Sequence, residues 1–266
     1  MHPRAEIILT YNILITGATG FVGGNIVKSL RNKDIKLTVI QRGQKKISID
    51  GYKKNINRIV TDDLFEENTH WWLNVLKEID CVIHSAWFVK PPNYLESNLN
   101  HKCLEGSITM AEAIVKSEVK KVVGIGTCFE YDLSFGLLSI DTPLLPHTLY
   151  GKAKVELFKK MNELFSANDI GFAWCRLFYV YGEGEHKNRL FPTLIDGIKQ
   201  GKKIQLTNGN QIRDFISIDT ASRWIADVAL SDDEGAINIC SGVPVTVRQF
   251  SEQILGIYGG NKSLLE

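Results

Sequence analysis

The sequence lacks the features that mark membrane-spanning and disulfide-stabilised proteins. None of its apolar runs approaches the roughly 20 residues needed to span a bilayer, although the chain has 266 residues. There are only five cysteines, an odd number, and no two of them form a CxxC pair. This pattern indicates neither a disulfide framework nor a zinc site, so we expect no bound metal. We therefore expect a cytoplasmic protein with reduced thiols.

Excess charge and internal repetition are also missing. The sequence balances 31 Lys and Arg against 30 Asp and Glu, which gives a net charge of +1. Because this balance exerts no general attraction on polyanions, we expect neither nucleic acid nor an anionic membrane as a partner. No repeat or low-complexity tract is present, and the hydrophobic share of 44% is ordinary for a soluble globular protein.

The chain instead alternates short β-branched runs with amphipathic stretches. The runs predict strands at 12–16, 37–40, 59–61, 81–84, 122–125 and 171–178, and the stretches between them predict helices at 21–30, 71–77, 104–115 and 150–165. Continuous apolar strands separated by helices are typical of a parallel sheet that is covered on both faces. We therefore predict a doubly wound α/β fold.

Beyond residue 179 the alternation is less regular. We predict helices at 190–199, 219–230 and 247–258 and strands at 203–206, 215–218 and 236–240. The expected division places residues 1–179 and 214–232 in a nucleotide-binding core. Residues 180–213 and 233–266 are then expected to form a smaller C-terminal lobe that closes a substrate cleft over one edge of the sheet.

A glycine-rich loop lies between the first predicted strand and the first predicted helix. Its sequence is Gly17, Ala18, Thr19, Gly20, Phe21, Val22, Gly23. Gly17 permits a tight turn, Gly20 lets the backbone approach a pyrophosphate, and Gly23 lets the helix pack close to the sheet. The helix N-terminus then presents free N–H groups to the phosphates. The loop predicts a dinucleotide site.

The end of the second predicted strand indicates which dinucleotide binds. An acidic residue there holds the 2′-hydroxyl of NAD, whereas an Arg accommodates the 2′-phosphate of NADP. Here Gln41 stands where the acid is expected, and Arg42 follows it. A guanidinium suits a phosphate dianion, so NADP(H) is favoured and NAD(H) is the alternative. After the third strand, Asp62 could accept from the adenine amino group with Leu64 beside it, or could simply belong to a turn.

Tyr150 and Lys154 form a YxxxK pair. Residues four apart share a helix face, so the ammonium can lie beside the phenol and lower its pKa from about 10. Eight tyrosines give about 0.7 such pairs by chance, so the motif carries little weight without its position. It opens the helix before the sixth strand and follows a strand that ends at Thr127, whose hydroxyl is expected to face the cleft.

The motifs, in this order, resemble those of the extended short-chain dehydrogenases/reductases, and more narrowly the nucleotide-sugar epimerase, dehydratase and reductase group. The resemblance runs from about residue 12 to about residue 255. It rests on the glycine loop, on Thr127, on Tyr150 with Lys154, and on segments 82–86, 176–182 and 213–215. It implies a Rossmann sheet with a smaller nucleotide-sugar lobe. Relatives usually continue with a further strand and helix beyond the position of Glu266.

The resemblance also implies roles for individual residues. Tyr150 would be the acid/base, Lys154 would bind the nicotinamide ribose and tune Tyr150, and Thr127 would hydrogen-bond the reacting sugar oxygen. Further cofactor contacts would come from Ser85, Ala86 and Phe178.

The substrate side of the site is implied in the same way. Arg213 would meet the substrate pyrophosphate, and Arg189 would do similar work at the start of the smaller lobe. Tyr179 would also contact the substrate, although relatives often have Asn at this position. Apart from the resemblance, Trp87 could line the cleft and contact the substrate, or could simply pack beneath it. Relatives often dimerise through two helices per subunit, which makes a homodimer the family-based expectation.

Several reactions are open to this group of enzymes. Dehydratases carry an Asp-Glu pair directly after the catalytic threonine, whereas Cys128 and Phe129 follow here. Glu130 is expected to point the other way on an extended segment. An epimerase favours tightly held NAD and a reductase consumes NADPH. Arg42 therefore favours an NADPH-dependent reductase of a 4-keto-6-deoxy nucleotide sugar, with Tyr150 as proton donor. An NAD-dependent nucleotide-sugar 4-epimerase is the alternative, ahead of a dehydratase or a non-catalytic NADP(H)-binding protein.

Overall fold

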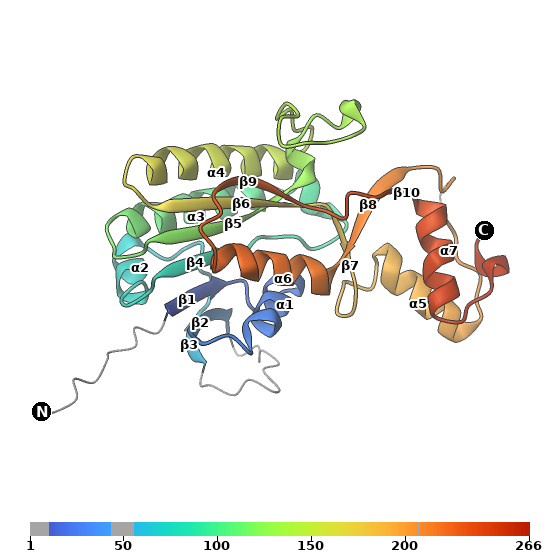
Figure 1. Ribbon diagram of the computed structural model, residues 1–266, viewed down its shortest axis with the longest axis horizontal. Coiled ribbons are helices and arrows are strands. Elements are labelled where there is room, and N and C mark those ends of the chain that lie inside the picture. Colours follow the sequence, from blue (N-terminus) through green and yellow to red (C-terminus); the bar gives the residue numbers. More distant parts are fainter. Residues whose placement is uncertain (1–10, 44–55, 207) are drawn as a thin grey trace, which may run out of the picture.

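A seven-stranded parallel sheet forms the centre of the protein in the computed structural model, which describes residues 11–43, 56–206 and 208–266. The strand order is β3-β2-β1-β4-β5-β6-β9 (Figure 1). The strands are β1 (Tyr11–Thr16), β2 (Ile35–Arg42), β3 (Asn57–Thr61), β4 (Cys81–His84), β5 (Lys121–Thr127), β6 (Gly171–Leu177) and β9 (Gly235–Ile239). This order confirms the predicted doubly wound α/β fold.

Helices cover both faces of this sheet. On one face lie α1 (Phe21–Leu30) and α6 (Ile218–Ala229), and on the other lie α2 (Thr69–Val75), α3 (Leu99–Val115) and α4 (Leu149–Ser166). Each face buries its own apolar cluster, and each large side chain buried there contributes roughly 1.5–3 kcal/mol. In the described ranges, no helix is long and apolar enough to cross a bilayer.

A smaller three-stranded sheet packs beside the main one, at the right of Figure 1. Its order is β10-β8-β7, formed by β7 (Tyr179–Tyr181), β8 (Ile212–Ser217) and β10 (Pro244–Thr246). Helices α5 (Leu190–Gln200) and α7 (Val247–Ile257) enclose a third apolar cluster against it. Phe215 and Phe250 stack within this cluster with ring centroids 3.9 Å apart.

Two expectations about the C-terminal region are wrong. Strand β9 pairs with β6 in the main sheet, whereas we expected residues 233–266 to belong wholly to the smaller lobe. The strand extends the sheet at the edge of β6, where Ile239 packs into the apolar cluster shared with α1 and α6. The strand expected at 203–206 is reduced to a single bridge between Ile204 and Leu265. The division into two lobes otherwise stays a prediction.

Strand β5 ends at Thr127, one of the predicted site residues. Every residue of the strand is buried. A Cβ atom at Gly124 or Gly126 would lie 2.3 Å from the indole of Trp174 on β6, so only glycine leaves room for this ring. The Trp174 indole packs against these two glycines, and its N–H donates to Glu130 in the turn that follows Thr127.

Candidate active site

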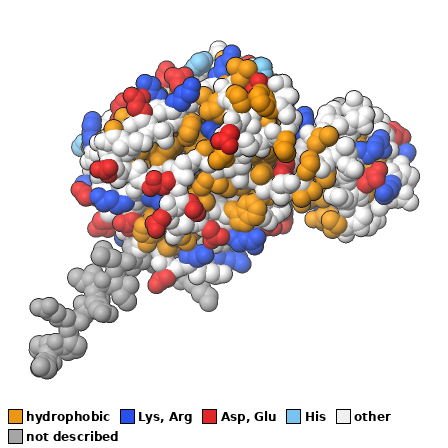
Figure 2. Space-filling model, turned by 45° about the horizontal axis from the view of Figure 1, so that its top comes forward, with side chains coloured by type: hydrophobic (Ala, Val, Ile, Leu, Met, Phe, Trp, Pro, Cys, Tyr) orange, Lys and Arg blue, Asp and Glu red, His pale blue; other side chains and the backbone are white. Residues whose placement is uncertain are grey.

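A cavity of about 800 Å³ lies at the carboxyl ends of the parallel strands, where doubly wound sheets bind their ligands. Hydrophobic side chains continue across the junction between the main body and the smaller lobe (Figure 2). The cavity is lined by all but one of the predicted site residues: Gly17, Thr19, Gly20, Phe21, Val22, Gly23, Arg42, Leu64, Ser85, Ala86, Trp87, Thr127, Tyr150, Lys154, Phe178, Tyr179, Arg189 and Arg213. Their individual roles stay predictions.

The glycine loop has the geometry of a phosphate cradle. Gly17 has a φ of +70°, and a Cβ atom there would lie 2.7 Å from the backbone nitrogen of Ala86. A Cβ atom at Gly23 would lie 2.3 Å from the carbonyl oxygen of Gly17. The N-cap of α1 is Gly20, which has no side chain to occupy the first N–H groups, and the first turn carries no acidic residue. These N–H groups are therefore available to an anionic ligand.

A buried histidine fixes the loop that faces the glycine cradle. The Ser107 hydroxyl donates to the Cys103 carbonyl, so it can only accept from Nε2 of His84, 2.8 Å away. Nδ1 of His84 therefore accepts from the Thr16 hydroxyl at 2.9 Å. The Thr16 oxygen in turn accepts from the backbone N–H of Ala86. His84 lies beneath the cleft, and burial lowers its pKa to about 3, which keeps the ring neutral.

At the other end of the cavity, the structure corrects the predicted adenine contact. Asp62 is exposed and does not line the cavity; its neighbour Asp63 does. Burial alone would raise the pKa of Asp63, but hydrogen bonds from Lys102, at 2.8 Å, and from the Phe65 N–H lower it below its usual range. The turn after β3 directs the second of the two acids inward. Arg42 ends β2 and lines the same part of the cavity.

Thr127 and Tyr150 meet at the centre of the cavity. Thr127 ends β5, and its hydroxyl oxygen accepts from the Phe129 N–H at 3.3 Å, so its own hydrogen can donate to the adjacent Tyr150 oxygen. Tyr150 stands in the first turn of α4, which Thr148 caps. Burial raises the pKa of Tyr150 above its ordinary value, and the hydrogen bond with the adjacent Thr127 hydroxyl opposes this rise. We expected a lowered pKa; in this structure the direction is the opposite, because the phenol is almost fully buried.

Lys154 lies one turn beyond Tyr150 and is buried. Its ammonium donates to the Ile125 carbonyl at 2.8 Å and lies 3.8 Å from the centre of the Trp87 ring. Burial lowers the pKa of Lys154 to about 7, and the negative charge of Glu130 opposes this shift. The predicted influence of Lys154 on the Tyr150 phenol stays a prediction.

Glu130 does not lie on an extended segment, as we expected, but in the 3₁₀ turn η2 (Cys128–Glu130). Its buried carboxylate accepts from the Thr127 N–H at 2.8 Å, from the Trp174 indole at 3.0 Å and from Arg176 Nε at 2.7 Å. Burial raises the pKa of Glu130, while Arg176 and the N–H donors favour the charged form. The carboxylate does not line the cavity and is paired instead with the buried guanidinium of Arg176 on β6.

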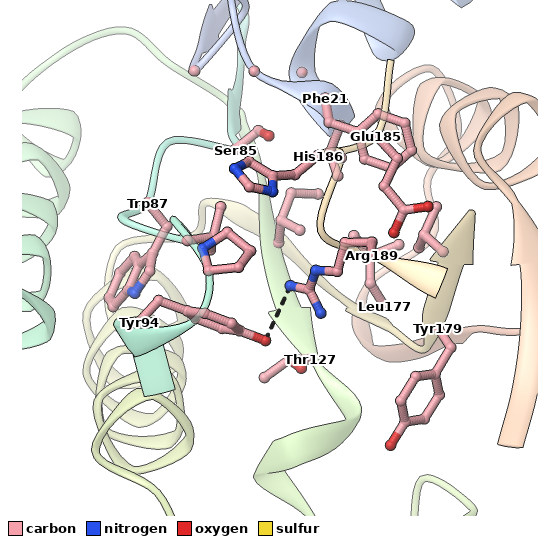
Figure 3. Close-up of a pocket in the computed structure, with 18 of the residues that line it drawn as sticks. Phe21, Ser85, Trp87, Tyr94, Thr127, Leu177, Tyr179, Glu185, His186 and Arg189 are labelled. Atoms are coloured by element: carbon pink, nitrogen blue, oxygen red, sulfur yellow. Dashed lines mark hydrogen bonds between the residues drawn. The ribbon is translucent and has the colours of Figure 1, made fainter. Parts of the chain in front are cut away.

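Two further pairs of side chains, each from two different elements, line the cavity. Arg189, the N-cap of α5, donates through Nη2 to the hydroxyl of Tyr94 at 3.3 Å, across the cavity (Figure 3). Arg213 on β8 lies over the Tyr179 ring at 5.1 Å. Tyr94, in the 3₁₀ turn η1 (Asn93–Glu96), was not predicted as a site residue. Its ring centre is 5.2 Å from that of Tyr150, and no local motif in its loop signals this contact.

Glu185 is a second residue that sequence reasoning missed. It follows β7 in the loop before α5, and its side chain lies beside Phe21 and Arg189 (Figure 3). Its Oε2 atom is buried without a hydrogen-bond partner, since Arg189 turns toward Tyr94. Burial raises the pKa of Glu185 to about 7, and the charge of Arg189 opposes the rise.

The raised pKa of Glu185 makes the stability of the protein depend on pH. The folded protein binds the proton of Glu185 more tightly than the unfolded chain does, so this group destabilises the fold as pH rises from about 4.5 to about 7. We expect Glu185→Gln to leave the stability unchanged near pH 4.5. Above pH 7 the gain should be about 1–2 kcal/mol, after allowance for partial exposure.

Melting temperatures at pH 5 and pH 8 measure this effect. Glu183→Gln is the matched control, because Glu183 belongs to the same loop and is exposed. Its melting temperature should follow that of the unmodified protein at both pH values. An equal shift for Glu185→Gln at the two pH values would contradict the assignment.

Comparison with known proteins identifies the family. Residues 13–240 match the NAD dependent epimerase/dehydratase family. This match covers most of the chain, and the protein belongs to that family. It is thus an oxidoreductase or epimerase enzyme with the extended short-chain dehydrogenase/reductase fold.

Individual relatives cover nearly the whole chain. The dTDP-6-deoxy-L-talose 4-dehydrogenase (NAD(+)) of Aggregatibacter actinomycetemcomitans is 26% identical over 252 residues, which cover 92% of this chain and 89% of the relative. A putative UDP-glucose 4-epimerase of Methanocaldococcus jannaschii is 25% identical over 256 residues, covering 91% and 81%. The solved UDP-N-acetylglucosamine 4-epimerase of Methanobrevibacter ruminantium M1 has a TM-score of 0.84 at 23% identity, covering 95% of this chain and 83% of that one, and shows the shared fold.

Proposed function

We propose that the protein is an NADPH-dependent reductase of a 4-keto-6-deoxy nucleotide sugar, with Tyr150 as the proton donor. The observation that carries the proposal is the meeting of Thr127 and a protonated Tyr150 in the cavity that the glycine loop opens onto. A phenol, whose ordinary pKa is about 10, keeps its proton at neutral pH and can donate it to a carbonyl oxygen during reduction. An epimerase or a dehydrogenase would have to remove a proton first.

The class of substrate follows from the relatives and from the charge of the cavity. A 4-dehydrogenase of a 6-deoxy nucleotide sugar, run in reverse, reduces a 4-keto-6-deoxy sugar. Arg189 and Arg213 bring two guanidinium groups from the smaller lobe to the cavity, where a diphosphate would pair with them. The Glu130 carboxylate forms a buried ion pair with Arg176 beneath the site, so it is not placed to act as the extra acid or base of a dehydratase.

The residues present fit a nicotinamide dinucleotide. The cradle at Gly17 and Gly23 leaves no space for side chains, and the uncapped N-terminus of α1 offers N–H groups to a pyrophosphate. When bound, the nicotinamide supplies the hydride. We expect Ser85, Ala86 and Phe178 to contact it, and Arg42 to pair with a 2′-phosphate.

The protein's own side chains supply the proton transfer that accompanies the hydride. Tyr150 donates its proton to the substrate carbonyl oxygen, and the hydroxyl hydrogen of Thr127 donates a hydrogen bond to the same oxygen. The positive charge of Lys154 favours the phenolate that Tyr150 becomes.

An NAD-dependent nucleotide-sugar 4-epimerase is the second candidate. It is favoured by the 4-epimerases among the relatives and by the NAD in the description of the family. The same residues would serve it, with Tyr150 first accepting and later returning the proton. The cofactor separates the two candidates, because a reductase must exchange it in every turnover.

A titration of NADPH and NADH into cofactor-free protein, followed by fluorescence, tests the proposal. We expect NADPH to bind more tightly, and Arg42→Ala to weaken NADPH binding about 10-fold while leaving NADH binding nearly unchanged, since a charge-assisted pair is lost. Arg58→Ala is the matched control, because Arg58 is an exposed arginine on the neighbouring strand β3. It should leave both affinities unchanged.

The opposite result favours the alternative. Tighter binding of NADH would contradict the proposed preference for NADPH. NAD that co-purifies and does not exchange would contradict the reductase assignment and support the epimerase. An equal loss of affinity for both cofactors in Arg42→Ala would show that Arg42 does not recognise the 2′-phosphate.

A further inference from the structure

Lys154 is a buried ammonium without a carboxylate partner at ion-pair distance in the described part of the chain. Its one hydrogen-bond acceptor among these residues is the Ile125 carbonyl. An ammonium removed from water is unstable unless other groups replace its hydration. The largest replacement here is the Trp87 ring, whose centre lies 3.8 Å from Nζ, while the ring of Trp174 lies farther away, at 5.7 Å.

Trp87 is itself held firmly in place. Its indole N–H donates to Oδ1 of Asn100 at 2.8 Å. Asn100 is fully buried, and its amide nitrogen donates to the carbonyls of Tyr94, at 2.7 Å, and Ser97, at 2.9 Å. The indole therefore cannot turn without leaving buried polar groups unpaired.

The same ring contacts the proposed proton donor. The ring centres of Trp87 and Tyr150 are 6.4 Å apart in an edge-on arrangement, and Phe65 packs against Trp87 at the same distance. Figure 3 shows Trp87 and Tyr94 on one side of the cavity. Trp87 thus touches both the ammonium and the phenol of the YxxxK pair.

We propose that Trp87 is a positioning residue that keeps Lys154 charged and in place beside Tyr150 through a cation–π contact. Tryptophan has the strongest ring for such a contact, and the contact strengthens when water is excluded. The proposal rests on the proposed function only where it assigns Lys154 a role beside Tyr150. The cation–π contact between Trp87 and Lys154 is a property of the ligand-free protein.

Other titrating groups near Lys154 do not obscure its titration. Burial raises the pKa of Cys103 on α3 and lowers that of His84 on β4 to about 3. Burial also raises the pKa of Tyr150 on α4, and Glu130 after β5 is paired with Arg176. Lys154, with a pKa of about 7, is the group of this set that titrates near neutral pH.

Titration of the ¹³Cε signal of Lys154 in ¹³C-lysine-labelled, ligand-free protein tests the proposal, with Lys154→Arg to assign the signal. We expect Trp87→Leu to lower the titration midpoint by about one pH unit, the order of a desolvated cation–π contact. Trp87→Phe loses the same hydrogen bond to Asn100 but keeps a ring, so its midpoint should fall less. A midpoint in Trp87→Leu equal to that of the unmodified protein would overturn the proposal.

A second measurement tests the proposal even if Trp87→Leu fails to fold. Replacement of all tryptophans by difluorotryptophan weakens the ring's attraction for cations without changing its shape, and only Trp87 and Trp174 lie over Lys154. The Lys154 midpoint should again fall, and an unchanged midpoint overturns the proposal. If the midpoint moves as expected while the unmodified protein does not reduce a 4-keto-6-deoxy nucleotide sugar, the proposed function fails and the cation–π contact of Trp87 with Lys154 stands.

Discussion

Replacement of Tyr150 by Phe is expected to lower turnover by about 10²–10⁴-fold, because it removes the proposed proton donor beside Thr127. The ring stays, so its packing against Tyr94 and Trp87 should persist. Affinity for the dinucleotide should change by less than about 2-fold, since the glycine cradle is untouched. Consumption of NADPH with a 4-keto-6-deoxy nucleotide sugar measures turnover, and quenching of protein fluorescence measures cofactor binding.

Tyr94→Phe is the matched control for this experiment. Its ring lies 5.2 Å from that of Tyr150, and it loses a hydroxyl from the same cavity. That hydroxyl accepts from Arg189, so its loss should affect mainly KM and leave kcat within a few-fold. If Tyr150→Phe kept substantial turnover, or if the two variants lost kcat equally, Tyr150 would not be the proton donor.

The fold could be predicted from the sequence because its signals are local. Each buried strand of the main sheet is a short apolar run, and the glycine loop lies where the first strand meets the first helix. The carboxyl ends of parallel strands must then share one edge, which brings Thr127 and the glycine loop to one cavity. Strand β9 was misplaced because its pairing with β6 is set by the free edge of the sheet rather than by its own residues.

Site residues that directly follow a strand or begin a helix were predicted from the sequence. Site residues whose position depends on the path of a loop were missed. Tyr94 and Glu185 enter the cavity from η1 and from the loop after β7, and their paths depend on packing between distant segments. Asp62 and Asp63 differ by one position in a turn, and only the turn geometry selects Asp63. The direction of the pKa shift of Tyr150 was wrong for the same reason, since burial depends on the whole fold.

Glu130 shows how a sequence motif and a structure can assign one carboxylate differently. It follows Thr127 closely enough to suggest an acid or base, yet every described partner of its carboxylate is an N–H donor. Arg176, buried beside it, also donates to the hydroxyl of Tyr131 at 2.9 Å. The backbone N–H of Thr127 is one of the donors to the Glu130 carboxylate. The ion pair between Glu130 and Arg176 therefore holds the end of β5 in place.

We therefore expect Glu130→Gln to destabilise the protein by about 3–5 kcal/mol, because it leaves the Arg176 charge buried and unpaired. The melting temperature should fall by roughly 6–12 °C. Asp227→Asn, which breaks the exposed pair with Lys33, is the matched control and should cost less than about 1 kcal/mol. Thermal and urea unfolding of the three proteins measure these differences.

A double variant separates a structural ion pair from a catalytic carboxylate. Glu130→Leu with Arg176→Met removes both charges together, so it should be more stable than either single change, as found for buried pairs replaced by apolar residues of similar volume. Loss of turnover in Glu130→Gln with unchanged melting temperature would instead indicate that Glu130 takes part in proton transfer, and would return the dehydratase to consideration. The geometry favours the first outcome, because a general acid or base must reach the substrate, and this carboxylate already receives its hydrogen bonds from Thr127, Trp174 and Arg176 beneath the cavity.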